Sequence, residues 1–261
     1  MRTPRLTARS HRMGKRKKGN CIFCLSRPAT EKEHVFPRSW YPSTTPPSVQ
    51  YVTAPVCDVC ADEFEIAERK FSFPVLMGMD PSNPDVASVM DGLRRSWQFD
   101  KAPSIRESVY RAAKLKSIAR QIKYVVRPPN TPAPWRLEVP VRTPAGLLVK
   151  ASPALELDHE VAVKICEKFV RGLHYNETKV PLPIDTPILF QWLKRLAFDV
   201  RASIEQLPLN NLLAPGLRYR VRREDNCSFW VFYLWGQVEF VAFAGTPTPD
   251  SNKGLTGGST E

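Results

Sequence analysis

The sequence has no run of about 18 apolar residues that would span a bilayer, and it has no apolar segment typical of a secretory signal. It contains only six cysteines in 261 residues, too few for a scaffold held together by disulfides. Internal repeats are absent. With an apolar content of 43%, the chain is expected to be a soluble cytoplasmic protein, without membrane contact, in which paired cysteines bind metal.

Acidic residues are missing from the first eighteen positions, which carry eight basic ones. The eight are Arg2, Arg5, Arg9, Arg12, Lys15, Arg16, Lys17 and Lys18. The whole chain has 38 basic and 26 acidic residues, giving a formal net charge of +12. An excess of this size indicates a polyanionic partner, and we expect nucleic acid, with DNA the first choice.

Residues 1–19 admit three interpretations. They form a solvated tail, an arm that binds phosphates, or a mitochondrial transit peptide. The third ranks lowest because the segment lacks the apolar face of such a peptide. If the arm binds nucleic acid, its contacts are expected from Arg12 and from Lys15, Arg16, Lys17 and Lys18.

Two Cys-x₂-Cys pairs, Cys21 with Cys24 and Cys57 with Cys60, flank residues 25–56. Each pair can hold one cation with two thiolates, and the two pairs together complete a tetrahedral shell of four sulfurs. Thiolates favour zinc, so the sequence predicts one structural zinc. A redox dithiol or four buried free thiols are the alternatives. Cys166 and Cys227 are expected to be core residues.

The rest of the chain is punctuated by proline and by capping residues. We expect a helix from about residue 84 to Trp97, and a second helix that a capping box at Ser104–Glu107 opens towards Val125. Residues 135–151 predict two strands. Further predicted elements are helices at 158–173, ending at a glycine, and 187–207, followed by a strand meander at 219–223, 228–235 and 238–244.

Between the cysteine pairs lies the segment Glu33-His34-Val35-Phe36-Pro37-Arg38. An acidic residue, a histidine and a nearby proline between two such pairs, the second of which opens a helix, resemble the HNH (ββα-metal) endonucleases. The likeness is to their four-cysteine zinc branch, which includes phage recombination endonucleases, and it covers about residues 21–71.

The resemblance implies roles for individual residues. His34 would be the general base that deprotonates the attacking water, and Glu33 would bind a second, catalytic divalent ion such as Mg²⁺, Mn²⁺ or Ni²⁺. Arg38 would contact a flanking phosphate. Val52 and Ala61 stand where the family has an orienting Asn and a metal-binding Asn or His. Asp62 is then the expected substitute ligand.

His34 and Glu33 also have simpler, purely structural interpretations. His34 can be a partly buried residue that hydrogen-bonds a backbone carbonyl, and Glu33 a surface carboxylate paired with Arg38 or Lys32. The resemblance nevertheless predicts a metal-dependent endonuclease that hydrolyses phosphodiester bonds in DNA, with RNA as the second choice. The alternatives are a catalytically inactive zinc protein that binds nucleic acid, or a defence or toxin protein whose C-terminal part recognises a partner.

The predicted fold class is α+β. A zinc-bound HNH-like module at 20–75 follows the basic arm at 1–19. A helical segment at 76–127 leads into an α+β domain at 128–245 that ends in an antiparallel meander. Gly, Ser, Thr and Pro dominate residues 246–261, which are expected to be a disordered tail.

Overall fold

The computed structural model describes residues 19–95, 98–125, 139–211, 216–224 and 226–245. The predicted basic arm (all but Gly19) and the predicted C-terminal tail lie outside these ranges. None of the helices in the described ranges is both long and apolar enough to cross a membrane.

The described residues form an α+β fold, as predicted. The helices are α1 (Asp58–Met77), α2 (Pro84–Arg95), α3 (Ile105–Gln121), α4 (His159–Thr178) and α5 (Phe198–Glu205), with short 3₁₀ turns η1 (Arg38–Trp40) and η2 (Leu193–Arg195). The strands are β1 (Glu31–His34), β2 (Thr53–Val56), β3 (Lys123–Val125), β4 (Val139–Arg142), β5 (Leu148–Ala154), β6 (Ile188–Trp192), β7 (Leu209–Asn211), β8 (Leu217–Glu224), β9 (Cys227–Leu234) and β10 (Val238–Gly245). They make three antiparallel sheets, ordered β1-β2, β3-β5-β4 and β6-β10-β9-β8-β7.

The N-terminal unit has the order β1-β2-α1. Strand β1 pairs antiparallel with β2, so that His34 lies opposite Thr53 and Glu33 opposite Ala54. Helix α1 begins at Asp58, immediately after Cys57. The second cysteine pair therefore opens a helix, as the sequence predicts, and the unit has the ββα arrangement.

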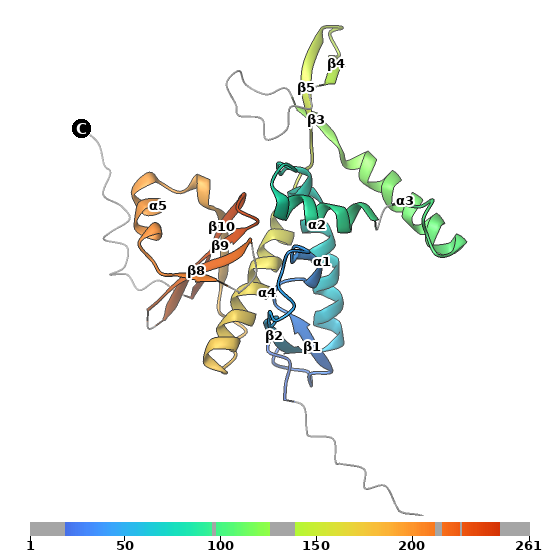
Figure 1. Cartoon of the computed structure of the whole chain (residues 1–261). Coiled ribbons are helices and arrows are strands. Elements are labelled where there is room, and N and C mark those ends of the chain that lie inside the picture. The colour runs from blue at the N-terminus through green and yellow to red at the C-terminus, as the bar shows by residue number, and fades with distance from the viewer. Residues whose placement is uncertain (1–18, 96–97, 126–138, 212–215, 225, 246–261) are drawn as a thin grey trace, which may run out of the picture.

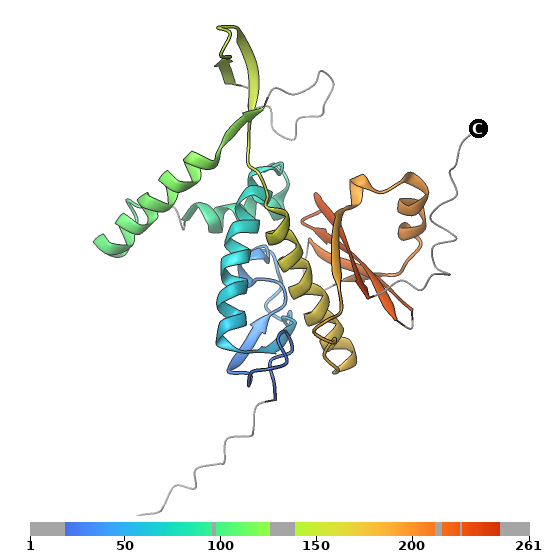
Figure 2. The ribbon, with the colours of Figure 1, turned by 180° about the vertical axis from the view of Figure 1, so that it is seen from behind.

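Helix α4 lies between α1 and the five-stranded sheet in both views of the molecule (Figures 1 and 2). It contacts α1 and β2 on one side and β6 and β10 on the other. Asp158 starts it, because its side chain accepts a hydrogen bond from the backbone N–H of Glu160 at 2.9 Å. On the far side of the sheet from α4 lies α5, while α3 and the β3-β5-β4 sheet extend away from the rest of the molecule (Figure 1).

The five-stranded sheet is apolar on both faces because both are covered. Along β9, Trp230, Phe232 and Leu234 belong to the core shared with α4. Val231, between them, packs with Ile204 of α5. Neighbouring strand residues point to opposite faces, so this run of large apolar residues needs a helix on each side.

One apolar core joins the ββα unit to the sheet. Phe36, in the loop after β1, packs on Phe169 of α4 with ring centroids 4.3 Å apart, and Phe169 packs on Phe232 of β9 at 5.4 Å. Trp235, after β9, donates from Nε1 to the carbonyl of Trp40 at 2.8 Å. The ββα unit thus buries its apolar face against α4 and the sheet.

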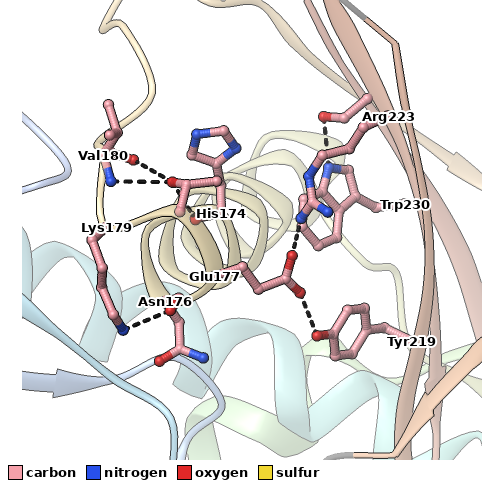
Figure 3. A network of polar contacts seen from close by, with 10 residues as sticks. His174, Asn176, Glu177, Lys179, Val180, Tyr219, Arg223 and Trp230 are labelled. Carbon is pink, nitrogen blue, oxygen red and sulfur yellow. Dashed lines mark hydrogen bonds and ion pairs between the residues drawn. The ribbon is translucent and has the colours of Figure 1, made fainter.

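Polar groups in the C-terminal half of α4 hold it against the sheet and against the chain before β6. Near the C-terminal end of α4, Glu177 accepts a hydrogen bond from the Tyr219 hydroxyl at 2.5 Å and pairs with Arg223, which lies over the Trp230 ring (Figure 3). Burial and the neighbouring Glu177 raise the pKa of Tyr219, so its hydroxyl stays a donor. Buried Arg171 donates to four carbonyls in residues 182–186 and so holds the chain that leads into β6.

Several predicted boundaries differ from the observed ones. The prediction of a helix at 187–207 is wrong at its start, because residues 188–192 pair with β10 as edge strand β6 before α5 begins. The helix predicted at 158–173 continues through Gly172 to Thr178. Of the predicted capping box the Ser104 cap is confirmed, since Ser104 accepts from the Glu107 N–H at 3.2 Å. The Glu107 carboxylate pairs with Arg111 instead, and α3 ends at Gln121.

Gly172 lies in the helix instead of ending it because α4 there passes very close to β1. A Cβ atom at this position would lie 2.4 Å from Cγ2 of the buried Val35 side chain. A helix interior normally disfavours glycine relative to alanine by roughly 0.5–1 kcal/mol, so close packing explains this residue.

We therefore predict opposite effects of the same change at two helical glycines. Gly172→Ala should destabilise the fold by about 1–3 kcal/mol, the usual cost of overpacking, in urea unfolding. Gly92→Ala in α2, where a Cβ would meet nothing within 4 Å, should be neutral or stabilising. Adding Val35→Ala should recover part of the Gly172→Ala loss. Equal effects of the two glycine changes would contradict this account of the packing.

Candidate functional site

The four cysteines of the two pairs come together at the start of α1. The Sγ atoms of Cys21, Cys24, Cys57 and Cys60 all lie within 4.8 Å of one another. The Cys24 and Cys57 sulfurs are 3.8 Å apart. In a tetrahedron with Zn–S bonds of about 2.3 Å, the sulfurs are separated by about 3.8 Å. The cluster is therefore close to the size that a zinc ion needs. All six cysteines of the chain are free thiols.

Local backbone geometry positions each pair. In the first, the Cys21 N–H donates to the carbonyl of Arg27 at 2.8 Å, and the chain turns at Leu25, whose φ is 55°. In the second, Cys57 precedes α1 with extended backbone angles, and Cys60 lies in the first turn. A tight loop and a helix N-terminus thus present two thiols each to the same point.

Three of the thiols have shifted acidity. Burial raises the pKa of Cys21 and of Cys60. Burial acts on Cys24 in the same direction, but hydrogen bonds from Ser26 and from the Arg27 backbone outweigh it and lower the pKa of Cys24 to about 6. A bound Zn²⁺ would favour the thiolate form of all four cysteines.

The cluster is closed, which marks it as structural. Cys21, Cys57 and Cys60 are buried, and four sulfurs fill a tetrahedral shell with no position left for a water or a substrate oxygen. Within the described ranges, the four cysteines are the one group of three or more His, Cys, Asp and Glu residues placed to hold a metal. Glu33, His34 and Asp62 are not part of any such group.

Glu33 contacts a cation that the sequence prediction missed. Its Oε1 lies 2.5 Å from Nζ of Lys168, which reaches across from α4. The Lys168 side chain is completely buried, and its ammonium also pairs with Glu68 of α1. The ammonium lies 5.4 Å from the centroid of the Phe64 ring. These contacts form one cluster, Glu33–Lys168–Glu68, which ties β1, α1 and α4 together.

The second carboxylate of this cluster is the more enclosed. Burial raises the pKa of Glu68, and Glu33 raises it further, whereas Lys168 lowers it. Lys168 thus keeps two acidic groups close together inside the fold. The sequence contained a signal that Lys168 is buried and paired. Lys168 lies between Ile165 and Phe169, two buried residues on one face of a predicted amphipathic helix, where a charged residue requires a partner.

His34 and Asp62 lie apart from this cluster in their contacts. The His34 ring is partly buried and packs edge-on against Tyr51 at a centroid distance of 5.6 Å. The exposed Arg38 guanidinium approaches the same tyrosine ring at 5.7 Å. Asp62 is exposed on α1. Neighbouring residues of a strand point to opposite faces, so Glu33 faces Lys168 while His34 faces Tyr51. Val52 accepts a backbone hydrogen bond from Val35 at 2.9 Å.

Comparisons with protein-family models, with curated proteins and with solved structures give no match to this chain.

We predict that the purified protein binds one zinc ion per chain and that Cys57→Ser loses it. Zinc binding in such sites contributes about 10–16 kcal/mol, so the variant should unfold the β1-β2-α1 unit and become protease-sensitive. Elemental analysis and limited proteolysis measure both effects. Cys227→Ser removes a thiol outside the cluster and should keep the metal. Metal-free wild type that resists protease like the zinc-loaded protein would contradict the prediction.

A second prediction concerns Lys168. Lys168→Met leaves two carboxylates facing each other without a cation and should destabilise the fold by about 3–5 kcal/mol. Lys164→Met, one turn earlier, breaks the exposed pair with Glu63 at 2.9 Å and a contact with the Phe64 ring, and should cost at most about 1 kcal/mol. Chemical denaturation measures both.

Recovery distinguishes charge from packing. The triple variant Lys168→Met/Glu33→Gln/Glu68→Gln removes the repulsion along with the cation and should regain most of the lost stability. A triple variant as unstable as Lys168→Met would show that the carboxylates are not the cause.

Proposed function

We propose that the protein binds nucleic acid through a zinc-stabilised ββα module of the HNH type in which a lysine ammonium, not a divalent ion, neutralises the acidic residue before the histidine. The observation that carries this proposal is the 2.5 Å contact between Glu33 and the buried Lys168.

Electrostatics supports binding over cleavage at this position. A catalytic divalent ion needs carboxylate ligands on one side and an open position for the phosphate oxygen on the other. Here the Glu33 carboxylate already has a cationic partner with no exposed surface, so a phosphate cannot reach that charge. The residues Val52 and Ala61, apolar where the family carries polar groups, agree with the loss of a metal position.

Binding itself is supported by charge on the exposed part of the module. Arg27, Lys32 and Arg38 are exposed around β1, and eight basic residues precede the first cysteine pair in sequence. Arginine forms paired hydrogen bonds to phosphate, and each phosphate contact releases counterions. A module of this charge, held rigid by zinc, fits a nucleic-acid backbone.

The second candidate function is the endonuclease that the family resemblance implies. It is favoured by the adjacent Glu33 and His34 on β1, in a unit with ββα order and four zinc-binding cysteines. Cleavage would require a divalent ion to displace Lys168 from Glu33. His34 would then act as the general base, and Asp62 as a further ligand.

Two assays on the zinc-loaded protein separate the candidates. Gel-shift titration tests binding to DNA and RNA, and supercoiled plasmid with Mg²⁺, Mn²⁺ or Ni²⁺ tests nicking. We expect wild type to bind with a steep salt dependence and not to nick. Nicking that falls by about 10²–10⁴ in His34→Ala would establish the nuclease and overturn the inactive module.

Further variants identify the ligands if nicking occurs. Asp62→Asn should then raise the metal requirement, and Glu33→Ala should lose activity. Nicking by Lys168→Met but not by wild type would show that Lys168 blocks a functional metal position. Wild type that neither binds nor nicks nucleic acid would overturn both candidates.

A further inference from the structure

A groove on the opposite side of α1 from Lys168 lies between α1 and α3. It encloses about 310 Å³. Its lining combines basic, hydroxyl and aromatic side chains, and the residues that matter here are Arg69, Lys70, Phe73, Tyr110, Lys114 and Ser117. Neither the cysteine cluster nor the Glu33–Lys168–Glu68 cluster contributes to it.

Helical spacing explains why these side chains share one groove. On α1, Ile66, Arg69, Lys70 and Phe73 follow the i, i+3, i+4, i+7 pattern and form one stripe along the helix. On α3, Tyr110, Lys114 and Ser117 form the facing stripe at the same kind of spacing. The stripe of α1 that packs on α4 is a different one, with Phe64, Ala67 and Phe71 buried.

The cations in this groove repel one another and have little acidic compensation. Burial lowers the pKa of Lys114, and the nearby Arg69 and Arg111 lower it further. The nearest acid on α3, Glu107, already accepts from Arg111 at 2.9 Å. Arg69 has only an exposed contact with Glu65 at 3.6 Å. No ion pair of Lys70 or Lys114 occurs within the part of the chain that the structure describes. An anion bound here would relieve this repulsion.

We propose that the α1–α3 groove binds single-stranded nucleic acid, with Arg69, Lys70 and Lys114 at the phosphates and Tyr110 stacked on a base. This inference rests on the proposed function for the identity of the polyanion. The Tyr110 side chain is 53% exposed and therefore accessible to an unpaired base. Cationic grooves with accessible aromatic rings suit single strands, because a duplex keeps its bases stacked inside.

The groove and the cysteine cluster share α1. Lys70 lies ten positions after Cys60, a rise of about 15 Å along the helix. The acidic residues Asp62, Glu63 and Glu65 lie between them, so the positive charge of α1 begins at Arg69. The exposed Arg106, Lys116 and Arg120 extend the positive charge of α3.

The test uses the full-length, zinc-loaded protein and a fluorescein-labelled 20-nucleotide oligothymidylate, with anisotropy measured at several salt concentrations. Arg69→Ala/Lys114→Ala should bind more weakly and reduce the slope of log K against log salt by about 1.4, the loss of two phosphate contacts. Tyr110→Ala should bind roughly 5- to 150-fold more weakly at fixed salt, the loss of one stacked base.

The matched control is Lys194→Ala/Arg195→Ala, which removes one lysine and one arginine from exposed positions of η2 that do not line the groove. It should leave affinity within about threefold of wild type, and circular dichroism checks the fold of every variant. If the two double variants weaken binding equally, affinity depends on the overall positive charge and not on the groove, and the proposal is overturned. Tighter binding of a 20-base-pair duplex than of the single strand would overturn it as well.

Failure of the groove and failure of the proposed function give different results. Wild type that binds the oligonucleotide, with unchanged binding in the groove variants, overturns the groove alone. Wild type that binds no nucleic acid overturns both. Nicking that depends on His34 overturns the inactive-module proposal and leaves the groove measurement standing.

Discussion

The buried ammonium of Lys168 constrains how the molecule is assembled. A charge without solvent contact is tolerated only when it is paired, and its partners here come from β1 and α1, while Lys168 itself comes from α4. Lys168 lies 135 positions after Glu33 and 100 positions after Glu68 in the sequence. Removing Lys168 leaves two carboxylates without a cation, whereas removing either glutamate leaves a one-to-one ion pair. One turn further along α4, Gly172 packs so closely on the Val35 side chain that no Cβ would fit.

Two cations of different kinds would therefore hold the module. Zinc at the four cysteines would fix the first loop to the start of α1, and the Lys168 ammonium fixes β1 and the middle of α1 to α4. Zinc binding can form within residues 20–60, but the lysine contact exists only once α4 has packed. Metal at the cysteines would thus stabilise the loop and the start of α1. Packing on α4 completes the core of the module, because Phe169 of α4 contacts both Phe36 and Phe232 of the sheet.

Sequence patterns predicted the features that depend on local spacing. The cysteine pairs, the Ser104 cap, the meander and the ββα order follow from neighbouring residues, and the structure confirms them. Features that depend on residues distant in the sequence could not be predicted from local patterns. Residues 187–192 suit a helix as well as a strand, and only pairing with β10 decides. Glu33 was assigned a metal ion or a surface partner because Lys168 lies 135 positions away. Gly172 was taken as a helix end because its contact with Val35 is tertiary.

Helix α1 has two faces with different surroundings, which separates the environment of Glu33 from the proposed binding groove. One stripe, with Phe64 and Glu68, contacts Lys168 of α4, whose ammonium also pairs with Glu33. The other, with Arg69 and Lys70, faces α3 and stays accessible. Glu33 belongs to the first environment, whereas His34 packs on Tyr51 and Asp62 is exposed, and none of the three lines the groove. Under the proposed function, the lack of a catalytic metal position at Glu33 would therefore leave binding in the groove intact. Val52 and Ala61, apolar where the HNH resemblance implies polar groups, agree with that division.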